Sequence, residues 1–227
     1  MLLDDKSQGE SDNSSPHIDK ALWIITHAQR TLGPIYSTIS FNMIDSGEPL
    51  TIIIVKPTKK RNFYTLVTAG MSYKAMVDPK DLDKAQYYSE LVLGLPSVWK
   101  APKSEADIPN LEDKDKWPLL LLLTLAEFPH KTKTYLAQGH TVSLGGNYQG
   151  FSHAMFNFTL LGPEFEIMLE EKTDNLIFFL GVYPITNAEF DFKKQYTSEK
   201  LFEGLIENNV TLVFDADKKR IIRVDSL

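Results

Sequence analysis

Five successive leucines at residues 119–123 constrain the fold of this chain more than any other stretch. They lie in a segment, residues 117–128, that has Pro118 near its start and Pro129 directly after it. We expect this segment to be a helix that ends at Pro129. A helix that is apolar on every side has to be buried on most sides. The chain must therefore supply elements that pack around it, and this helix should be the central helix of the core.

Strand-like segments lie on both sides of the leucine run. Residues 64–68 are aromatic, aliphatic or β-branched, which favours a strand, and Gly70 after them predicts a tight turn. Residues 50–55 and 87–93 have a similar character and should lie beside this strand in one sheet. Further strands are predicted at residues 36–43, 154–161, 165–169, 176–182, 210–214 and 220–224, with a short extended piece at 139–142 before a loop that contains Gly145, Gly146 and Gly150.

Two more helices are expected near the ends of the chain. Apolar residues recur with helical spacing over residues 18–32, and we interpret His17 and His27 as surface residues on or near this helix. Thr186 followed by Glu189 matches a capping box and predicts the start of a closing helix. The expected fold class is therefore α+β, with a mixed, largely antiparallel sheet packed against a buried central helix and flanking helices.

The charge of the chain is concentrated in its first residues. We expect residues 1–15 to be a disordered acidic tail and residues 16–227 to form a single domain. The net charge is -6, but residues 16–227 keep 23 of the 24 basic and 26 of the 30 acidic side chains, a net of -3. This mild acidity argues against direct nucleic-acid binding, which needs a basic face, and suits a basic protein partner.

Composition also limits the compartment and the chemistry. The chain has no cysteine, which excludes disulfides, thiolate catalysis and zinc fingers. Asp4 and Asp5 lie near the N-terminus, where a signal peptide needs basic residues, and the longest apolar run is too short to cross a bilayer. We expect a cytoplasmic protein that does not contact membranes.

Ser72 is the residue most similar to a catalytic nucleophile. The segment from Gly70 to Lys74 follows a predicted strand, as the nucleophile elbow of a hydrolase does. Lys74 stands where that motif needs its second glycine, so Ser72 also fits an ordinary turn serine. The glycines of residues 145–150 have the spacing of a phosphate loop, but Phe151 stands where the loop needs lysine.

His130, His140 and His153 are the candidate ligands of a metal ion. No pair of them has the spacing of a zinc-binding helix, and no carboxylate lies nearby in the sequence as a further ligand. We expect no catalytic residue, no metal and no cofactor. A hydrolase or metal enzyme that uses Ser72 or His140 remains an alternative.

Aromatic and acidic residues are the candidates for contact with a protein partner. Trp99 lies in a loop bounded by prolines and is the aromatic residue most expected to be partly exposed, with packing under that loop as the alternative. An exposed aromatic residue beside a polar rim is a typical anchor of a protein interface. The full set of candidate partner-binding residues is Tyr73, Trp99, Glu112, Asp113, Trp117 and His140.

Four ordered blocks of this sequence resemble the suppressor of fused domain. They are residues 63–76, residues 90–96 with Trp99, residues 117–130 and residues 139–141, and the likeness continues more weakly over residues 180–205. Together they cover nearly the whole chain from about residue 35. The family often has His-Ile-Asp-Val before the first block, where this chain has Thr51 followed by the apolar residues 52–55.

The resemblance implies an α+β binding domain that is not an enzyme. Animal members sequester zinc-finger transcription factors of Hedgehog signalling and use a second domain that this chain is too short to contain. Stand-alone bacterial members look like immunity proteins encoded beside toxins. We therefore expect a monomeric immunity protein, or antitoxin, that neutralises a nuclease-like toxin, with a regulator that sequesters another protein as the alternative.

Overall fold

The computed structural model describes residues 16–42, 49–76, 88–148, 150–170 and 175–215. Three predictions lie outside the described residues: the acidic tail at 1–15, the strand at 220–224, and a turn that the residues Asp45, Ser46 and Gly47 predict between the first two strands. The other predicted elements can be compared with the structure directly.

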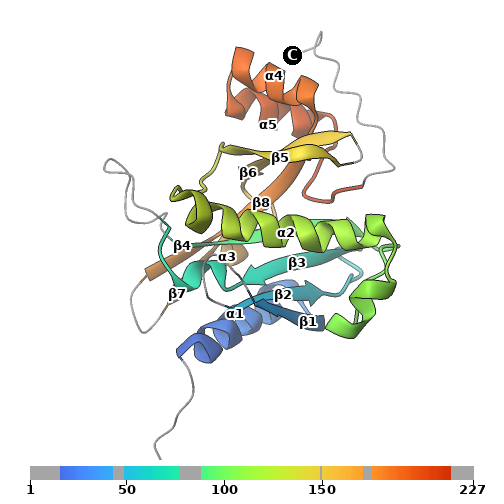
Figure 1. Cartoon of the computed structure of the whole chain (residues 1–227), viewed down its shortest axis with the longest axis vertical. Coiled ribbons are helices and arrows are strands. Elements are labelled where there is room, and N and C mark those ends of the chain that lie inside the picture. The colour runs from blue at the N-terminus through green and yellow to red at the C-terminus, as the bar shows by residue number, and fades with distance from the viewer. Residues whose placement is uncertain (1–15, 43–48, 77–87, 149, 171–174, 216–227) are drawn as a thin grey trace, which may run out of the picture.

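One eight-stranded sheet organises the described residues (Figure 1). Its main order is β1-β2-β3-β4-β8-β6-β5, and β7 pairs with β8 beside this path. All pairs are antiparallel apart from the parallel pair of β4 and β8, which confirms the predicted fold class. The strands are β1 (Ile35–Asn42), β2 (Pro49–Val55), β3 (Phe63–Ala69), β4 (Tyr88–Pro96), β5 (Thr141–Tyr148), β6 (Phe151–Asn157), β7 (Ile167–Glu170) and β8 (Asn175–Ile185).

Helices cover both faces of the sheet, and Figure 1 shows α2 lying across its front. Ile52 and Ile54 of β2 belong to the core beneath α2, whereas Ile53 and Val55 belong to the core beneath α1 on the opposite face. A strand with both faces buried reads as a continuous apolar run, as β2 does. The helices are α1 (Pro16–Leu32), α2 (Asp113–Thr132), α3 (Pro163–Glu166), α4 (Asn187–Gln195) and α5 (Ser198–Glu207), with 3-10 turns η1 (Met71–Tyr73) and η3 (Glu105–Asn110).

The central strand is where it was predicted. β3 pairs with β2 on one side and β4 on the other, which confirms the expected neighbours. Gly70 follows β3 with φ of 147°. A Cβ atom there would lie 2.4 Å from the carbonyl oxygen of Pro49, so only glycine fits this turn.

The leucine helix is longer than predicted and is not buried on every side. α2 continues past Pro129 to Thr132 and ends at Lys133, whose φ of 52° is left-handed. Proline removes one backbone hydrogen bond, which weakens a helix but does not end it where packing holds the next turn. Leu122 is fully buried, but Leu120 is 54% exposed on the outer side of α2.

The glycine loop and the strand at 165–169 differ from the prediction. Gly145 and Gly146 lie inside β5, where the register with β6 shifts between Ser143 and Tyr148. Gly145 has φ of 68°, a conformation that glycine allows in such a bulge. The predicted strand at 165–169 begins at Ile167, because Phe165 belongs to α3.

The predicted closing helix is two helices, and the strand after it is reduced to one bridge. The capping box at Thr186 and Glu189 is confirmed at the start of α4, but Thr197 begins a second helix, α5. Residues 210–214 form no strand; Val213 makes an isolated parallel bridge to Gly94. His27 of α1 is buried, so its surface placement was wrong.

Candidate protein-contact site

Ser72 is part of a buried hydrogen-bond network centred on Glu90. Its hydroxyl donates to Oε1 of Glu90 at 2.6 Å, and the backbone N–H groups of Gly70 and Ser72 donate to the same oxygen at 3.0 Å. Thr68 donates its hydroxyl to Oε2 at 2.6 Å. Ser72 and Glu90 are both fully buried. A serine with its hydroxyl committed to a carboxylate and no access to solvent is placed to hold a turn, not to attack a substrate.

A buried lysine fastens α1 to this network. Nζ of Lys20 donates to the carbonyl oxygen of Ser72 at 2.7 Å and lies 3.0 Å from Oε2 of Glu170 on β7. The network therefore connects α1 with the turn after β3, with β4 and with β7. Its buried contacts hold the β7 end of the sheet to α1.

The three histidines considered as metal ligands have different surroundings. His130 is hydrogen-bonded to the backbone of Met71, and His140 packs against Tyr135 with 4.8 Å between the ring centroids. His153 stacks on Phe190. Burial lowers the pKa of each imidazole from its ordinary value. The part of the chain that the structure describes contains no group of three or more His, Asp or Glu side chains arranged to hold a metal ion.

Trp99 is buried, so the expectation that it is partly exposed was wrong. It is 8% exposed, packs edge-on against Tyr64, and donates its indole N–H to the carbonyl oxygen of Asp115 at 3.0 Å. Trp117 is also buried and lies against Phe214. Both tryptophans belong to the core beneath α2.

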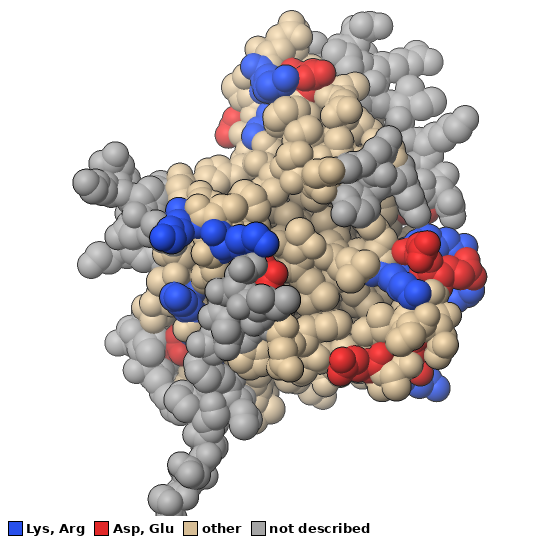
Figure 2. Space-filling view, in the orientation of Figure 1, with Lys and Arg blue, Asp and Glu red and all other residues tan. Residues whose placement is uncertain are grey.

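The acidic residues before α2 are mixed with lysines. Glu112 forms ion pairs with Lys100 and Lys114, and these contacts lower the pKa of its carboxyl group. Figure 2 shows side chains of both signs together on this side of the molecule. Asp113 is exposed in the first turn of α2. Tyr73 lies half-buried in η1, and His140 half-buried before β5, so the structure does not gather the predicted contact residues into one surface.

The indole hydrogen bond of Trp99 gives a direct test of its structural role. Trp99→Phe should lower the free energy of unfolding by about 1–2 kcal/mol, because it removes one hydrogen bond from a buried carbonyl group and some apolar contact. Urea denaturation measures this loss. Unchanged stability would contradict a packing role for Trp99 and favour the role in partner contact that was expected from the sequence.

Exposed apolar side chains gather instead around β7. Leu169 lies opposite Leu176 in the antiparallel register of β7 and β8, and Ile167 lies opposite Phe178. Large exposed apolar residues beside one another mark interaction surfaces in soluble proteins. We call the following five residues the β7 surface, with their exposed fractions: Phe158 52%, Leu160 53%, Ile167 45%, Leu169 55% and Leu176 37%.

The loop between β6 and α3 presents two of these side chains on a rigid backbone. The hydroxyl of Tyr183 donates to the carbonyl oxygen of Phe158 at 2.7 Å, and burial raises the pKa of this hydroxyl, which keeps it protonated. The carboxylate of Glu166 accepts hydrogen bonds from the Thr159 hydroxyl and from the Leu160 backbone N–H. A surface that is ordered before binding loses less entropy when a partner arrives.

Leu160 has a backbone conformation that leucine adopts at a cost. Its φ is 60°, in the left-handed region, which costs about 1–2 kcal/mol for a residue with a side chain. Its side chain is exposed and so recovers little of this cost by packing in the free protein. Conformations of this kind cluster at functional sites.

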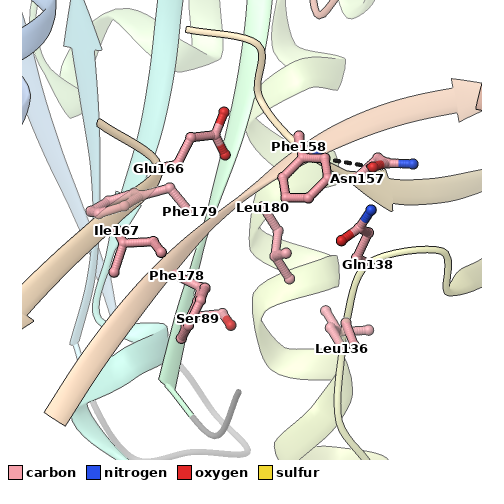
Figure 3. Close-up of a pocket in the computed structure, with 11 residues that line it drawn as sticks. Ser89, Leu136, Gln138, Asn157, Phe158, Glu166, Ile167, Phe178, Phe179 and Leu180 are labelled. Carbon is pink, nitrogen blue, oxygen red and sulfur yellow. Dashed lines mark hydrogen bonds between the residues drawn. The ribbon is translucent and has the colours of Figure 1, made fainter. Parts of the chain in front are cut away.

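A small cavity opens within the β7 surface (Figure 3). Its volume is about 120 Å³, and Phe158, Ile167, Phe178 and Leu180 provide much of its apolar lining. Gln138 adds a polar amide group. Ligand pockets for small molecules are typically ~300–1,000 Å³. A cavity of this size and character is suited to one or two side chains of a protein partner.

Comparison with known proteins identifies the family. The family model for the suppressor of fused protein (SUFU) matches residues 46–219, about three quarters of the chain. The chain belongs to the suppressor of fused family. A search of curated proteins gives no match.

Solved structures show that the suppressor of fused fold extends over most of the chain. A suppressor of fused homologue from Neisseria gonorrhoeae FA 1090 is 18% identical, with a TM-score of 0.61 over 89% of this chain and 96% of that protein. A chain of the Sufu–Fu complex has a TM-score of 0.61, 11% identity and coverage of 89% and 92%. Drosophila Suppressor of Fused has the same TM-score at 12% identity, and the match spans 89% of this chain and 51% of the Drosophila chain.

The sequence analysis did not indicate the exposed apolar residues of the β7 surface. It placed residues 154–161 in a strand, so that Phe158 and Leu160 were expected to pack in the sheet. The pattern of β7, whose first three residues are all apolar, did not indicate exposure. An apolar run predicts burial on both faces, but β7 leaves Ile167 and Leu169 exposed. No helix in the described part of the chain is both long enough and apolar enough to cross a membrane.

Proposed function

We propose that this suppressor of fused domain is a protein-binding domain without enzymatic activity, and that it binds its partner through the β7 surface. The observation that carries the proposal is the set of exposed apolar side chains around a small cavity on a rigid support. Leu160 supports it, because an exposed leucine in a left-handed conformation is better explained by contact with a partner than by the stability of the free domain.

The partner that suits the chain is a bacterial toxin, with the domain acting as its immunity protein in the cytoplasm. The mild acidity of residues 16–227 fits a basic, nuclease-like toxin, and complementary charge would speed association more than it would strengthen binding. We further propose that residues 16–227 act as one monomeric domain. Tyr73, Glu112, Asp113 and His140 remain candidates for additional polar contacts.

A regulator that sequesters another protein is the second candidate. The solved Sufu–Fu complex favours it, because there a protein of the same fold is bound to a protein partner. Enzymatic use of Ser72 has no comparable support, since that hydroxyl is buried and bonded to Glu90.

Co-expression with the product of the adjacent gene in the source genome tests the toxin proposal. The wild-type domain should restore growth of cells that express this product and should co-purify with it. The double variant Ile167→Asp, Leu169→Asp should weaken binding at least about 100-fold, because two carboxylates would face an apolar interface, and growth should then fail.

Leu120→Asp is the matched control, because Leu120 is as exposed as Leu169 but lies on α2. It should bind and protect like the wild type. Full protection by the double variant would exclude the β7 surface as the contact site. Binding of the gene product without any effect of that product on growth would favour the regulator over the immunity protein.

A further inference from the structure

β7 is an edge strand with the means to pair with another chain. Among the described residues it pairs with β8 only, although it is a strand of the main sheet. An edge strand offers backbone N–H and C=O groups that an added strand can bond. The buried contact between Lys20 and Glu170 holds this strand in place beside α1.

A second cavity lies beside β7 on the α1 side of the sheet. It has a volume of about 170 Å³ and is lined by Trp23, Thr26, His27, Arg30, Met168 and Leu169. The first cavity is lined by Ile167 and Phe178, which point to the face opposite α1, so the strand has a cavity on each face. Successive side chains of a strand point to opposite faces of a sheet. A strand added to β7 would therefore place alternate side chains toward the two cavities.

The two faces of β7 would contact different kinds of side chain on an added strand. Ile167, Leu169 and Leu176 present an apolar face. On the α1 side, Arg30 is exposed and forms no ion pair or hydrogen bond with the described residues. The other ionisable side chain that lines this cavity is His27, whose imidazole is buried and has its pKa lowered by that burial. A carboxylate is the group that complements an unpaired guanidinium.

We propose that β7 is the docking strand for an extended segment of the protein partner in which apolar residues alternate with at least one acidic residue. The apolar residues cover Ile167 and Leu169, and the acidic residue pairs with Arg30. Backbone hydrogen bonds to β7 supply affinity, and the two cavities supply specificity, as in other cases of strand addition. This inference rests on the proposed function and specifies the chemistry of the partner at the same site.

Peptide probes test the strand geometry directly. The first probe is an acetylated heptapeptide in which leucine alternates with aspartate, and two others carry N-methyl groups either on every leucine amide or on every aspartate amide. Only alternate amides of an added strand face β7. One methylated peptide should bind within about threefold of the first probe, and the other should lose at least about tenfold, as measured by fluorescence anisotropy. Equal effects of both methylations would overturn the proposal.

Charge reversal tests the role of Arg30. Arg30→Glu should weaken binding of the leucine–aspartate peptide at least about tenfold. The same variant should bind a peptide in which leucine alternates with lysine more tightly than the wild type does. Lys60→Glu reverses the charge of another exposed basic residue and is the control; it should change neither affinity beyond about twofold. An Arg30→Glu variant that behaves like this control would overturn the pairing with Arg30.

The remaining outcomes separate this inference from the proposed function. One outcome is that no peptide binds saturably up to millimolar concentration, while the double variant at Ile167 and Leu169 still fails to bind the co-expressed partner. Strand docking would then be wrong, but the β7 surface would still be supported as the contact surface. If the peptides bind as expected but the domain neither protects cells nor binds the gene product, the docking strand stands and the toxin proposal fails. Concentration-dependent dimers that β7 variants abolish would mean that a second copy occupies the edge, which would overturn the partner segment.

Discussion

Replacing Glu90 with alanine should lower the free energy of unfolding by about 3–5 kcal/mol. Its carboxylate accepts hydrogen bonds from the hydroxyls of Thr68 and Ser72 and from the backbone N–H groups of Gly70 and Ser72, all of them buried. Each buried donor left without an acceptor costs about 1–3 kcal/mol. The backbone at Gly70 lies so close to Pro49 that the turn has little room to move and find other acceptors. Urea denaturation of the two proteins gives the difference.

Two further variants separate the network from a general effect of charge. Glu90→Gln keeps one acceptor oxygen and should lose less stability than Glu90→Ala. Glu203→Ala removes an exposed carboxylate from α5 and should change stability by less than about 0.5 kcal/mol. A loss below about 1 kcal/mol for Glu90→Ala would contradict the importance of the network for the β3–β4 region.

Replacing single leucines of α2 with alanine should show which side of this helix stabilises the fold. Leu122→Ala should cost about 2–5 kcal/mol, because Leu122 is fully buried between α2 and the sheet and its loss leaves a cavity. Leu120→Ala makes the same chemical change in the same helix at an exposed position. It should cost less than about 1 kcal/mol.

Thermal and urea denaturation of both leucine variants provide the comparison, and their difference is independent of the helix propensities of leucine and alanine. Equal losses would mean that Leu120 is covered in solution, for example by a second copy. Size-exclusion chromatography at two concentrations would then reveal the association.

The prediction for Trp99 chose a suitable type of residue for an interface but placed it wrongly at the surface. Tryptophan is a good interface anchor, but Trp99 donates its indole N–H inward to Asp115 and is buried. The loop around it is rich in proline and charge, as an exposed loop is, yet it folds back over the Tyr64 ring. A short sequence window carries no information on which distant residue a side chain will meet.

The local sequence alone determined the secondary elements whose signals are local. The apolar run of residues 50–55 and the glycine at residue 70 place β2, β3 and the turn after them, because pleat, burial and backbone freedom act over a few residues. The capping box of Thr186 and Glu189 placed the start of α4 for the same reason. The four ordered blocks also sufficed for the family, since many weak local matches in a set order are specific together.

Tertiary structure decided which apolar residues are covered and which remain free. The leucines of residues 119–123 look alike in the sequence, but α2 rests on one face of a single sheet, so Leu122 is buried and Leu120 is not. Ile167 and Leu169 look like core residues, but β6 and β7 both pair with the same side of β8, and the short edge strand β7 leaves them exposed. Burial depends on contacts between residues far apart in the chain, and these contacts exist only once the sheet has assembled.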